Sequence, residues 1–206
     1  DLEVVCEAVR QIKTAFPAME ICTSLGLLTE EKATVLAEAG VDRYNHNLET
    51  AERNFKNVVS THTYEDRVDT IGAVHRAGME ACCGGIVGMG ESTDDQVDLA
   101  FALRELRVES IPVNFLDPRP GTPMGDSPRL TPQGCLRTLA MFRFVNPTRD
   151  IRVAGGREAN LRHLQALSLY PANSIFTEGY LTTGGQEASE DRRLIEDAGF
   201  RVLEVV

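Results

Sequence analysis

Positive charge is scarce in this sequence of 206 residues. The chain has 21 lysines and arginines against 31 aspartates and glutamates, which gives a formal net charge of −10. Nucleic-acid-binding domains usually present a basic patch or stripe, and no segment of this sequence supplies one. The composition therefore argues against nucleic acid as a partner.

Long apolar segments are also missing. Apolar runs such as Ala100–Leu103 are far shorter than the roughly 20 residues that cross a membrane as a helix. The first residues, Asp1-Leu2-Glu3, are acidic where a secretory signal carries basic residues. We therefore expect neither a membrane span nor secretion.

Cysteines are few, odd in number and not arranged in the C-x2-C pairs typical of zinc sites. This pattern argues against a disulfide framework and a structural zinc, and it favours a reducing cytoplasm. The five cysteines are Cys6, Cys22, Cys82, Cys83 and Cys135.

Helix-like and strand-like segments alternate along the chain. A helical pattern ends in Ala-Gly before a strand-like segment three times, and glycine is the residue that most often closes a helix. These endings are Ala39-Gly40, Ala77-Gly78 and Ala198-Gly199. Helix starts are predicted at Thr29, at Thr131-Pro132 and, from a capping box with Gln96, at Thr93.

Six strands are predicted between these helices, and strands that alternate with helices form a parallel sheet. The final residues, 200–206, fit either a further short strand or a tail. The predicted strands are Met19–Ser24, Arg43–Leu48, Glu80–Val87, Ile111–Leu116, Ile151–Ala154 and Ser174–Thr177.

Polar residues at alternate strand positions favour a barrel over a doubly wound sheet, since buried parallel strands are otherwise nearly all apolar. Asn45, Asn47 and Glu49 share one face of their strand, and Asn114 and Arg152 lie among apolar neighbours. A barrel lumen gives such groups a common place to point. The α/β fold expected is a (β/α)8 TIM-type barrel, which usually needs about 250 residues. We therefore expect residues 1–206 to be a single domain that lacks the first strand–helix units of the barrel.

Several of these residues have two interpretations on spacing alone. Arg152 fits either a buried salt bridge, for example to Glu49, or a contact with a ligand. The amides of Asn45 and Asn47 suit hydrogen bonds to ureido, amide or adenine-like groups, although such residues also cap helices. Cys22 and Cys82 could be small buried apolar residues or ligands.

Two other features argue against a phosphate-binding loop, a histidine metal site and a nucleophile–base pair. The glycine-rich segment Gly84–Glu91 matches no phosphate-binding pattern, and it indicates close approach of the backbone to a ligand. The four histidines have no mutual spacing typical of a metal triad or a nucleophile–base pair.

Seven sequence blocks, in order over nearly the whole chain, closely resemble the biotin synthase family of radical S-adenosylmethionine (SAM) enzymes. They are Tyr44–Thr50, Cys82 with Gly84–Gly88, Ile111–Asn114, Gly121–Pro123, Arg152 with Gly156–Glu158, Ala172–Phe176 and Leu181–Thr183. The resemblance implies sulfur insertion into dethiobiotin to form biotin. In that family a [4Fe–4S] cluster cleaves SAM to a radical, and a [2Fe–2S] cluster held by three cysteines and an arginine donates the sulfur.

The resemblance also implies roles for individual residues. Cys22, Cys82 and Arg152 match ligands of the [2Fe–2S] cluster, and thiolate is the usual ligand of such clusters. The residues matched to the small molecules are Asn45, Asn47 and Asn114 for dethiobiotin and SAM, Glu49 and Arg67 for SAM, and Thr182 and Thr183 for the carboxylate tail of dethiobiotin. The family further implies an electron-donor protein as a partner and a homodimer.

Two family features are absent from the sequence: the C-x3-C-x2-C motif that binds the [4Fe–4S] cluster, and the third cysteine of the [2Fe–2S] site. We therefore expect this chain to be an N-terminally truncated fragment that is inactive alone. Two alternatives stay open: a radical SAM enzyme with another substrate, such as those of thiazole, hydrogenase-cofactor or pyrrolysine assembly, and a non-catalytic relative.

Overall fold

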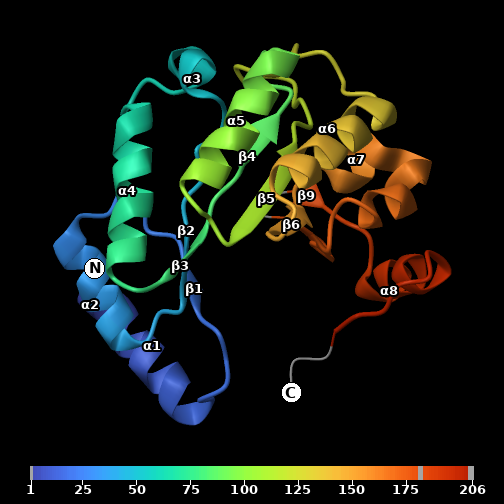
Figure 1. Ribbon diagram of the computed structural model, residues 1–206. Coiled ribbons are helices and arrows are strands. Elements are labelled where there is room, and N and C mark those ends of the chain that lie inside the picture. Colours follow the sequence, from blue (N-terminus) through green and yellow to red (C-terminus); the bar gives the residue numbers. More distant parts are fainter. Residues whose placement is uncertain (1, 181–182, 204–206) are drawn as a thin grey trace.

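The computed structural model describes residues 2–180 and 183–203. Strands and helices alternate along them, as the sequence predicts (Figure 1). The strands are β1 (Cys22–Thr23), β2 (Arg43–Asn45), β3 (Glu80–Cys82), β4 (Gly85–Val87), β5 (Ser110–Phe115), β6 (Asp150–Val153), β7 (Ser174–Ile175), β8 (Gly179–Tyr180) and β9 (Thr183–Gly184). Each of the six predicted strands is confirmed, with β3 and β4 dividing one of them.

The helices lie between these strands. They are α1 (Leu2–Ala15), α2 (Glu30–Ala39), α3 (Glu52–Val58), α4 (Tyr64–Arg76), α5 (Thr93–Glu105), α6 (Pro132–Val145), α7 (Arg157–Leu161), the 3₁₀ helix η1 (Arg162–Leu169) and α8 (Ala188–Asp197). Among the described residues, none of these helices is both long and apolar enough to cross a membrane.

The sheet is parallel and open. Its strands follow the order β1-β2-β3-β5-β6-β7, β4 also pairs with β5, and β8 and β9 form a separate antiparallel hairpin. Strand order that follows the chain in this way is the order of strands around a (β/α)8 barrel. The described residues thus form part of a barrel wall that is not closed, with β1 and β7 at its two edges. Residues 200–203 form neither a helix nor a strand.

Local signals set most helix ends. The backbone of Gly40 is left-handed, with φ of 104°. Its N–H donates to the last carbonyls of α2, as expected for a glycine that closes a helix. Thr29 and Thr131 cap the starts of α2 and α6. The capping box predicted at Thr93 is wrong by one residue: Ser92 and Asp95 form it, because the Asp95 carboxylate accepts from both the N–H and the hydroxyl of Ser92.

Glycines 84 and 85 allow two strands to approach closely. A Cβ at Gly84 would lie 1.9 Å from the carbonyl oxygen of Pro112, and one at Gly85 would lie 2.4 Å from that of Glu49. The sequence analysis predicted close approach to a ligand here. The structure instead shows that the glycines serve contact between backbone segments of the sheet.

Candidate active site on the inner face of the sheet

The two faces of the sheet differ sharply in polarity. Tyr44, Ala81, Ile111 and Ile151 point outward, are fully buried, and belong to one hydrophobic core with the helices. The neighbouring strand positions point to the opposite, inner face, because side chains alternate along a strand. Those positions carry the polar residues that the sequence analysis singled out: Asn45, Cys82, Asn114 and Arg152. The inner face therefore holds the candidate site.

Cys22 and Cys82 share this inner face. Cys22 is level with Arg43 on β2, and Asn45 two positions further along β2 is level with Cys82. The amide of Asn45 lies 3.5 Å from the Cys82 sulfur. Partial desolvation and the nearby Cys82 thiol raise the pKa of Cys22, while Arg43 and Arg152 lower it to a smaller extent. Two thiols and an arginine from three different strands are thus close enough to influence one another.

Cys83 differs from its neighbour. It is fully buried in the core on the outer face, where desolvation raises the pKa of its thiol strongly. Cys6 and Cys135 are buried in α1 and α6. These three cysteines pack in the core, as free cysteines usually do.

Arg152 is partly buried on β6 and lies on the inner face beside β7. Its Nε donates to the hydroxyl of Ser174 at 3.1 Å, and its guanidinium carbon is 5.7 Å from the centroid of the Phe176 ring. Within the part of the chain that the structure describes, no carboxylate lies within salt-bridge distance of Arg152. The salt bridge to Glu49 considered from the sequence is therefore wrong, since Glu49 pairs with Arg67.

A polar cluster joins the end of β2 to α4. Arg67 Nη1 donates to the backbone carbonyl of Asn47 and lies 3.2 Å from Glu49 Oε1. Burial raises the pKa of Glu49, and the Arg67 guanidinium opposes that rise. Glu49 has φ of 69°, a conformation that non-glycine residues rarely adopt and that concentrates at functional sites. The Asn47 amide oxygen accepts from the N–H of Gly84 at 3.1 Å.

Asn114 is held on both sides by backbone. Its amide nitrogen donates to the carbonyl of Gly85 at 3.2 Å, and its amide oxygen accepts from the N–H of Gly155 at 2.9 Å. An amide offers two hydrogens and two lone pairs, so one of each stays available to a ligand. The glycine-rich loop is different. The Glu91 carboxylate accepts from the N–H groups of Gly88 and Met89, each at 2.7 Å, which occupies donors that a phosphate would need.

Some predicted residues cannot be placed. Thr182 lies outside the described residues, and Thr183 is in β9, although its side chain is not among those described. His62 was missed by the sequence analysis. Its ring nitrogen Nε2 accepts from Arg67 Nε at 2.8 Å. The only signal in the sequence was its position in the loop just before α4.

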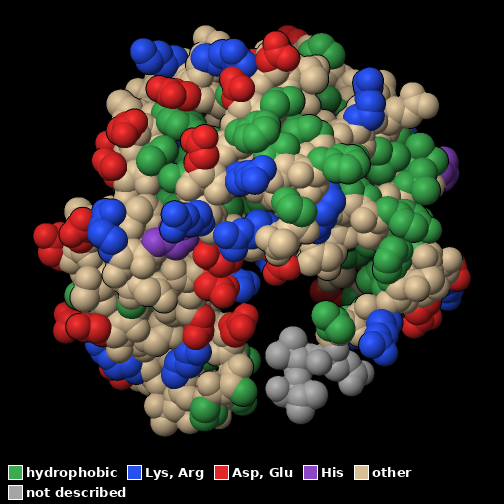
Figure 2. Space-filling model, viewed as in Figure 1, with side chains coloured by type: hydrophobic (Ala, Val, Ile, Leu, Met, Phe, Trp, Pro, Cys, Tyr) green, Lys and Arg blue, Asp and Glu red, His purple; other side chains and the backbone are tan. Residues whose placement is uncertain are grey.

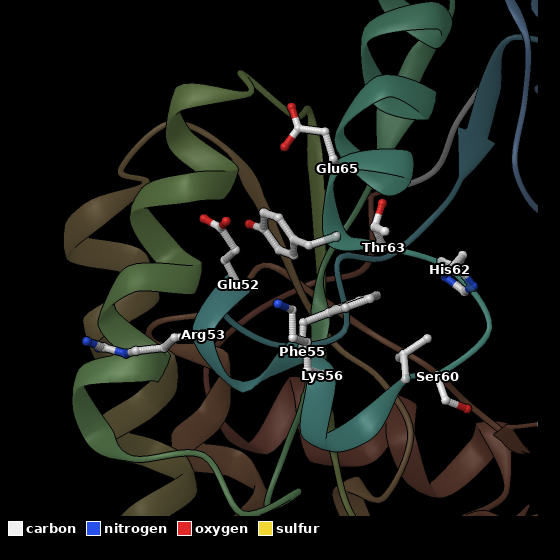
Figure 3. Close-up of a pocket in the computed structure, with 10 residues that line it drawn as sticks. Glu52, Arg53, Phe55, Lys56, Ser60, His62, Thr63 and Glu65 are labelled. Carbon is white, nitrogen blue, oxygen red and sulfur yellow. The ribbon is translucent and has the colours of Figure 1, made fainter.

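The described residues form pockets but no ready-made site for a single metal ion. Among residues 2–180 and 183–203, no group of three or more His, Cys, Asp or Glu side chains is arranged to hold a metal ion. One pocket of about 670 Å³ lies between α3 and the start of α4 (Figure 3). Another of about 660 Å³ lies beside η1, β7 and α8, where Ser174, the hydrogen-bond partner of Arg152, is part of its lining. The candidate site is an open sheet face, and charged side chains gather beside a hollow in the surface (Figure 2).

Comparison with protein families gives two matches along the chain. Residues 1–103 match the radical SAM superfamily, and residues 112–201 match the biotin and thiamin synthesis associated domain. The first match covers half of the chain. The chain belongs to the radical SAM superfamily.

Curated relatives narrow this assignment. The chain is 60% identical over 200 residues to the biotin synthase of Salinibacter ruber, and 53% identical over 202 residues to that of Staphylococcus haemolyticus. The alignments cover 97% and 98% of this chain. They cover 55% and 63% of the relatives, so the chain spans little more than half of their length.

Solved structures support the fold. Methylornithine synthase superposes with a TM-score of 0.83 at 16% identity, covering 99% of this chain and 64% of that structure. An FeFe-hydrogenase maturase from Carboxydothermus hydrogenoformans superposes with a TM-score of 0.77 at 13% identity, covering 97% and 52%. At such low identity these likenesses concern the fold alone, and they agree with the predicted radical SAM barrel.

Proposed function

We propose that residues 1–206 are a single domain of a biotin synthase, an enzyme that inserts sulfur into dethiobiotin by radical SAM chemistry. The observation that carries this proposal is the 60% identity of the chain to a curated biotin synthase. The placement of Cys22, Cys82 and Arg152 at strand positions that share the inner face supports it. When bound, a [4Fe–4S] cluster supplies the electron that cleaves SAM, and a [2Fe–2S] cluster supplies the sulfur.

The donor set on the inner face suits a [2Fe–2S] cluster. Thiolates are its preferred ligands, and Cys22 and Cys82 are the two cysteines at inner-face strand positions, Cys22 exposed and Cys82 buried. Arg152 keeps its charge at any physiological pH and has no carboxylate partner among the described residues, so its outer nitrogens can face a ligand. In this proposal these three residues hold the cluster. The [4Fe–4S] cluster has no C-x3-C-x2-C motif in this sequence to bind it.

The polar cluster and the asparagines are assigned to the small molecules. We propose that Glu49, Arg67 and Asn47 bind SAM. Glu49 has carboxylate oxygens for ribose hydroxyls, and Arg67 supplies positive charge toward a carboxylate. Asn45, Asn47 and Asn114 offer both donors and acceptors, which match a ureido ring. Thr182 and Thr183 are assigned to the carboxylate tail of dethiobiotin.

The remaining parts of the proposal concern the setting of the reaction. An electron-donor protein must deliver the electrons for SAM cleavage, and we propose a homodimer in the cytoplasm. Five unpaired cysteines support a reducing compartment.

Adjacent cysteines on β3 and just after it give a matched test. In the intact protein reconstituted with iron and sulfide, Cys82→Ala should remove the [2Fe–2S] absorption and abolish conversion of dethiobiotin to biotin. Cys83→Ala makes the same change of residue type at the neighbouring position, which faces the hydrophobic core. This variant should keep both the [2Fe–2S] absorption and the conversion of dethiobiotin. SAM binding, measured by calorimetry, should persist in each variant.

Other results would overturn the proposal. A normal [2Fe–2S] spectrum in Cys82→Ala would remove the ligand assignment. A wild-type protein that binds SAM but converts no dethiobiotin would indicate a radical SAM enzyme with another substrate, and one that binds neither SAM nor a cluster would be a non-catalytic relative.

A further inference from the structure

The loop between α3 and α4 supports Arg67 from the side opposite Glu49. Arg67 uses Nη1 for the backbone of Asn47 and for Glu49, and it uses Nε for Nε2 of His62 at 2.8 Å. Arg67 is well buried, with 12% of its side chain exposed. A buried guanidinium is oriented by the acceptors around it, so His62 fixes one side of this group.

The protonation state of His62 follows from this contact. Arginine can only donate hydrogen bonds, so Nε2 of His62 must accept and carry no proton. The other ring nitrogen, Nδ1, lies 2.9 Å from the hydroxyl of Thr61 and can donate to it. Only the neutral Nδ1–H form of the imidazole satisfies both contacts, and a protonated ring would oppose Arg67 with a like charge.

Aromatic packing holds both partners in place. The Phe55 ring of α3 lies 5.8 Å from the ring of His62 in an edge-on arrangement, and the Arg67 guanidinium carbon is 5.7 Å from the Phe55 centroid. Phe55 is 2% exposed, so this contact is part of the core. In Figure 3, His62 lies in the loop beyond Thr63, at the margin of the pocket between α3 and α4.

We propose that His62 is a positioning residue for SAM: as a neutral hydrogen-bond acceptor, it fixes the Arg67 guanidinium and, through it, the Glu49 carboxylate. The inference rests on the proposed function, in which Arg67 and Glu49 bind SAM. His62 does not itself touch SAM in this arrangement. It acts only through Arg67.

Two substitutions at His62 distinguish its role as a hydrogen-bond acceptor for Arg67 from the packing of its aromatic ring. His62→Gln keeps a hydrogen-bond acceptor, and His62→Phe keeps an aromatic ring without an acceptor. SAM is titrated by calorimetry into the intact, cluster-reconstituted protein at one neutral pH. His163→Gln, at an exposed position of η1, is the matched control.

We expect His62→Phe to weaken SAM binding about ten-fold, the size of one lost hydrogen bond to a charged group. His62→Gln should restore the wild-type affinity, because its amide oxygen can accept from Arg67 Nε. His163→Gln should bind SAM as wild type does. Circular dichroism of each variant checks that it is folded.

Wild-type affinity in folded His62→Phe would overturn the inference, as would a loss in His62→Gln as large as that in His62→Phe. If His62→Phe does not fold, His62→Leu, which also lacks an acceptor, takes its place in the comparison. A wild type that binds SAM but makes no biotin would defeat the proposed function and leave the His62 measurement decisive for SAM positioning.

Discussion

Arg152 and Arg157 lie close together in the chain but in opposite kinds of environment. Arg157, at the start of α7, is 1% exposed, and its Nη2 contacts both oxygens of Asp191 at 2.8 and 2.9 Å. Glu158 and the carbonyl of Phe176 accept from the same nitrogen. Among the described residues, the side chain of Arg152 on β6 contacts the Ser174 hydroxyl and the Phe176 ring and forms no ion pair.

The difference separates structural from functional charge. Burying a guanidinium is costly unless anions and acceptors surround it. Between α7 and α8 both terminal nitrogens of Arg157 have acceptors, and only its Nε lacks a partner among the described residues. Arg152 stays on an open face, and no described residue forms a hydrogen bond with its two terminal nitrogens. An arginine whose partners all come from the protein holds the fold together, whereas one with an open side toward a polar face is a candidate for binding.

The largest predicted effect is a loss of folding free energy when the Arg157–Asp191 pair is broken. Asp191→Ala removes the fully buried carboxylate partner of Arg157 and leaves only the partly exposed Glu158 beside its guanidinium. Breaking a buried pair in this way costs about 3–5 kcal/mol of folding free energy. Urea unfolding of the intact protein measures it. Glu190→Ala, the exposed neighbour on α8, should cost less than about 0.5 kcal/mol. A loss in Asp191→Ala as small as in Glu190→Ala would mean that the pair does not stabilise the fold.

The next effect concerns His46, a buried group that has no partner for its Nε2 among the described residues. Burial, and to a smaller extent Arg67 and His62, lower the pKa of His46 to about 4. The unfolded chain protonates His46 near pH 6.5, whereas the folded protein protonates it only near pH 4. Between these two values the unfolded chain binds one more proton than the folded protein, so the free energy of unfolding falls as pH falls. The loss attributable to His46 reaches about 3 kcal/mol near pH 4.

A comparison of unfolding curves tests the His46 prediction. The free energy of unfolding is measured for wild type and His46→Gln from neutral pH down to about pH 4, the folded pKa. The variant lacks the titrating group, so the gap between the two proteins should change by about 3 kcal/mol across the window. Parallel curves would show that His46 binds protons equally in both states.

Sequence reasoning predicted the features that depend on local pattern. The alternation of strands and helices, the closing glycine at Gly40 and the polar inner face all follow from side-chain periodicity and helix-end chemistry. The capping box differed by one residue because Ser92 and Thr93 are both good caps, and only the helix register chooses between them.

Features that depend on contacts across the fold were not predictable. The spacing of His62 and Arg67 in the sequence does not reveal that the loop folds back and brings the two side chains together. Likewise, the glycine at position 84 is required by the Pro112 carbonyl on another strand, which a single sequence cannot place. Glu49 pairs with Arg67 and not with Arg152, which was one of the two interpretations of Arg152, and the sequence could not decide this for the same reason.

The smallest expected effect on stability is at Arg152. Because its side chain is partly exposed and no described carboxylate depends on it, Arg152→Met should change the free energy of unfolding by less than about 1 kcal/mol. The same variant should lower the yield of biotin more than Arg152→Lys, which keeps the positive charge. Urea unfolding and a biotin assay on the same preparations compare the two properties. If Arg152→Met unfolded as readily as Asp191→Ala, Arg152 would belong with the structural arginine, and its assignment to the cluster would lose its physical basis.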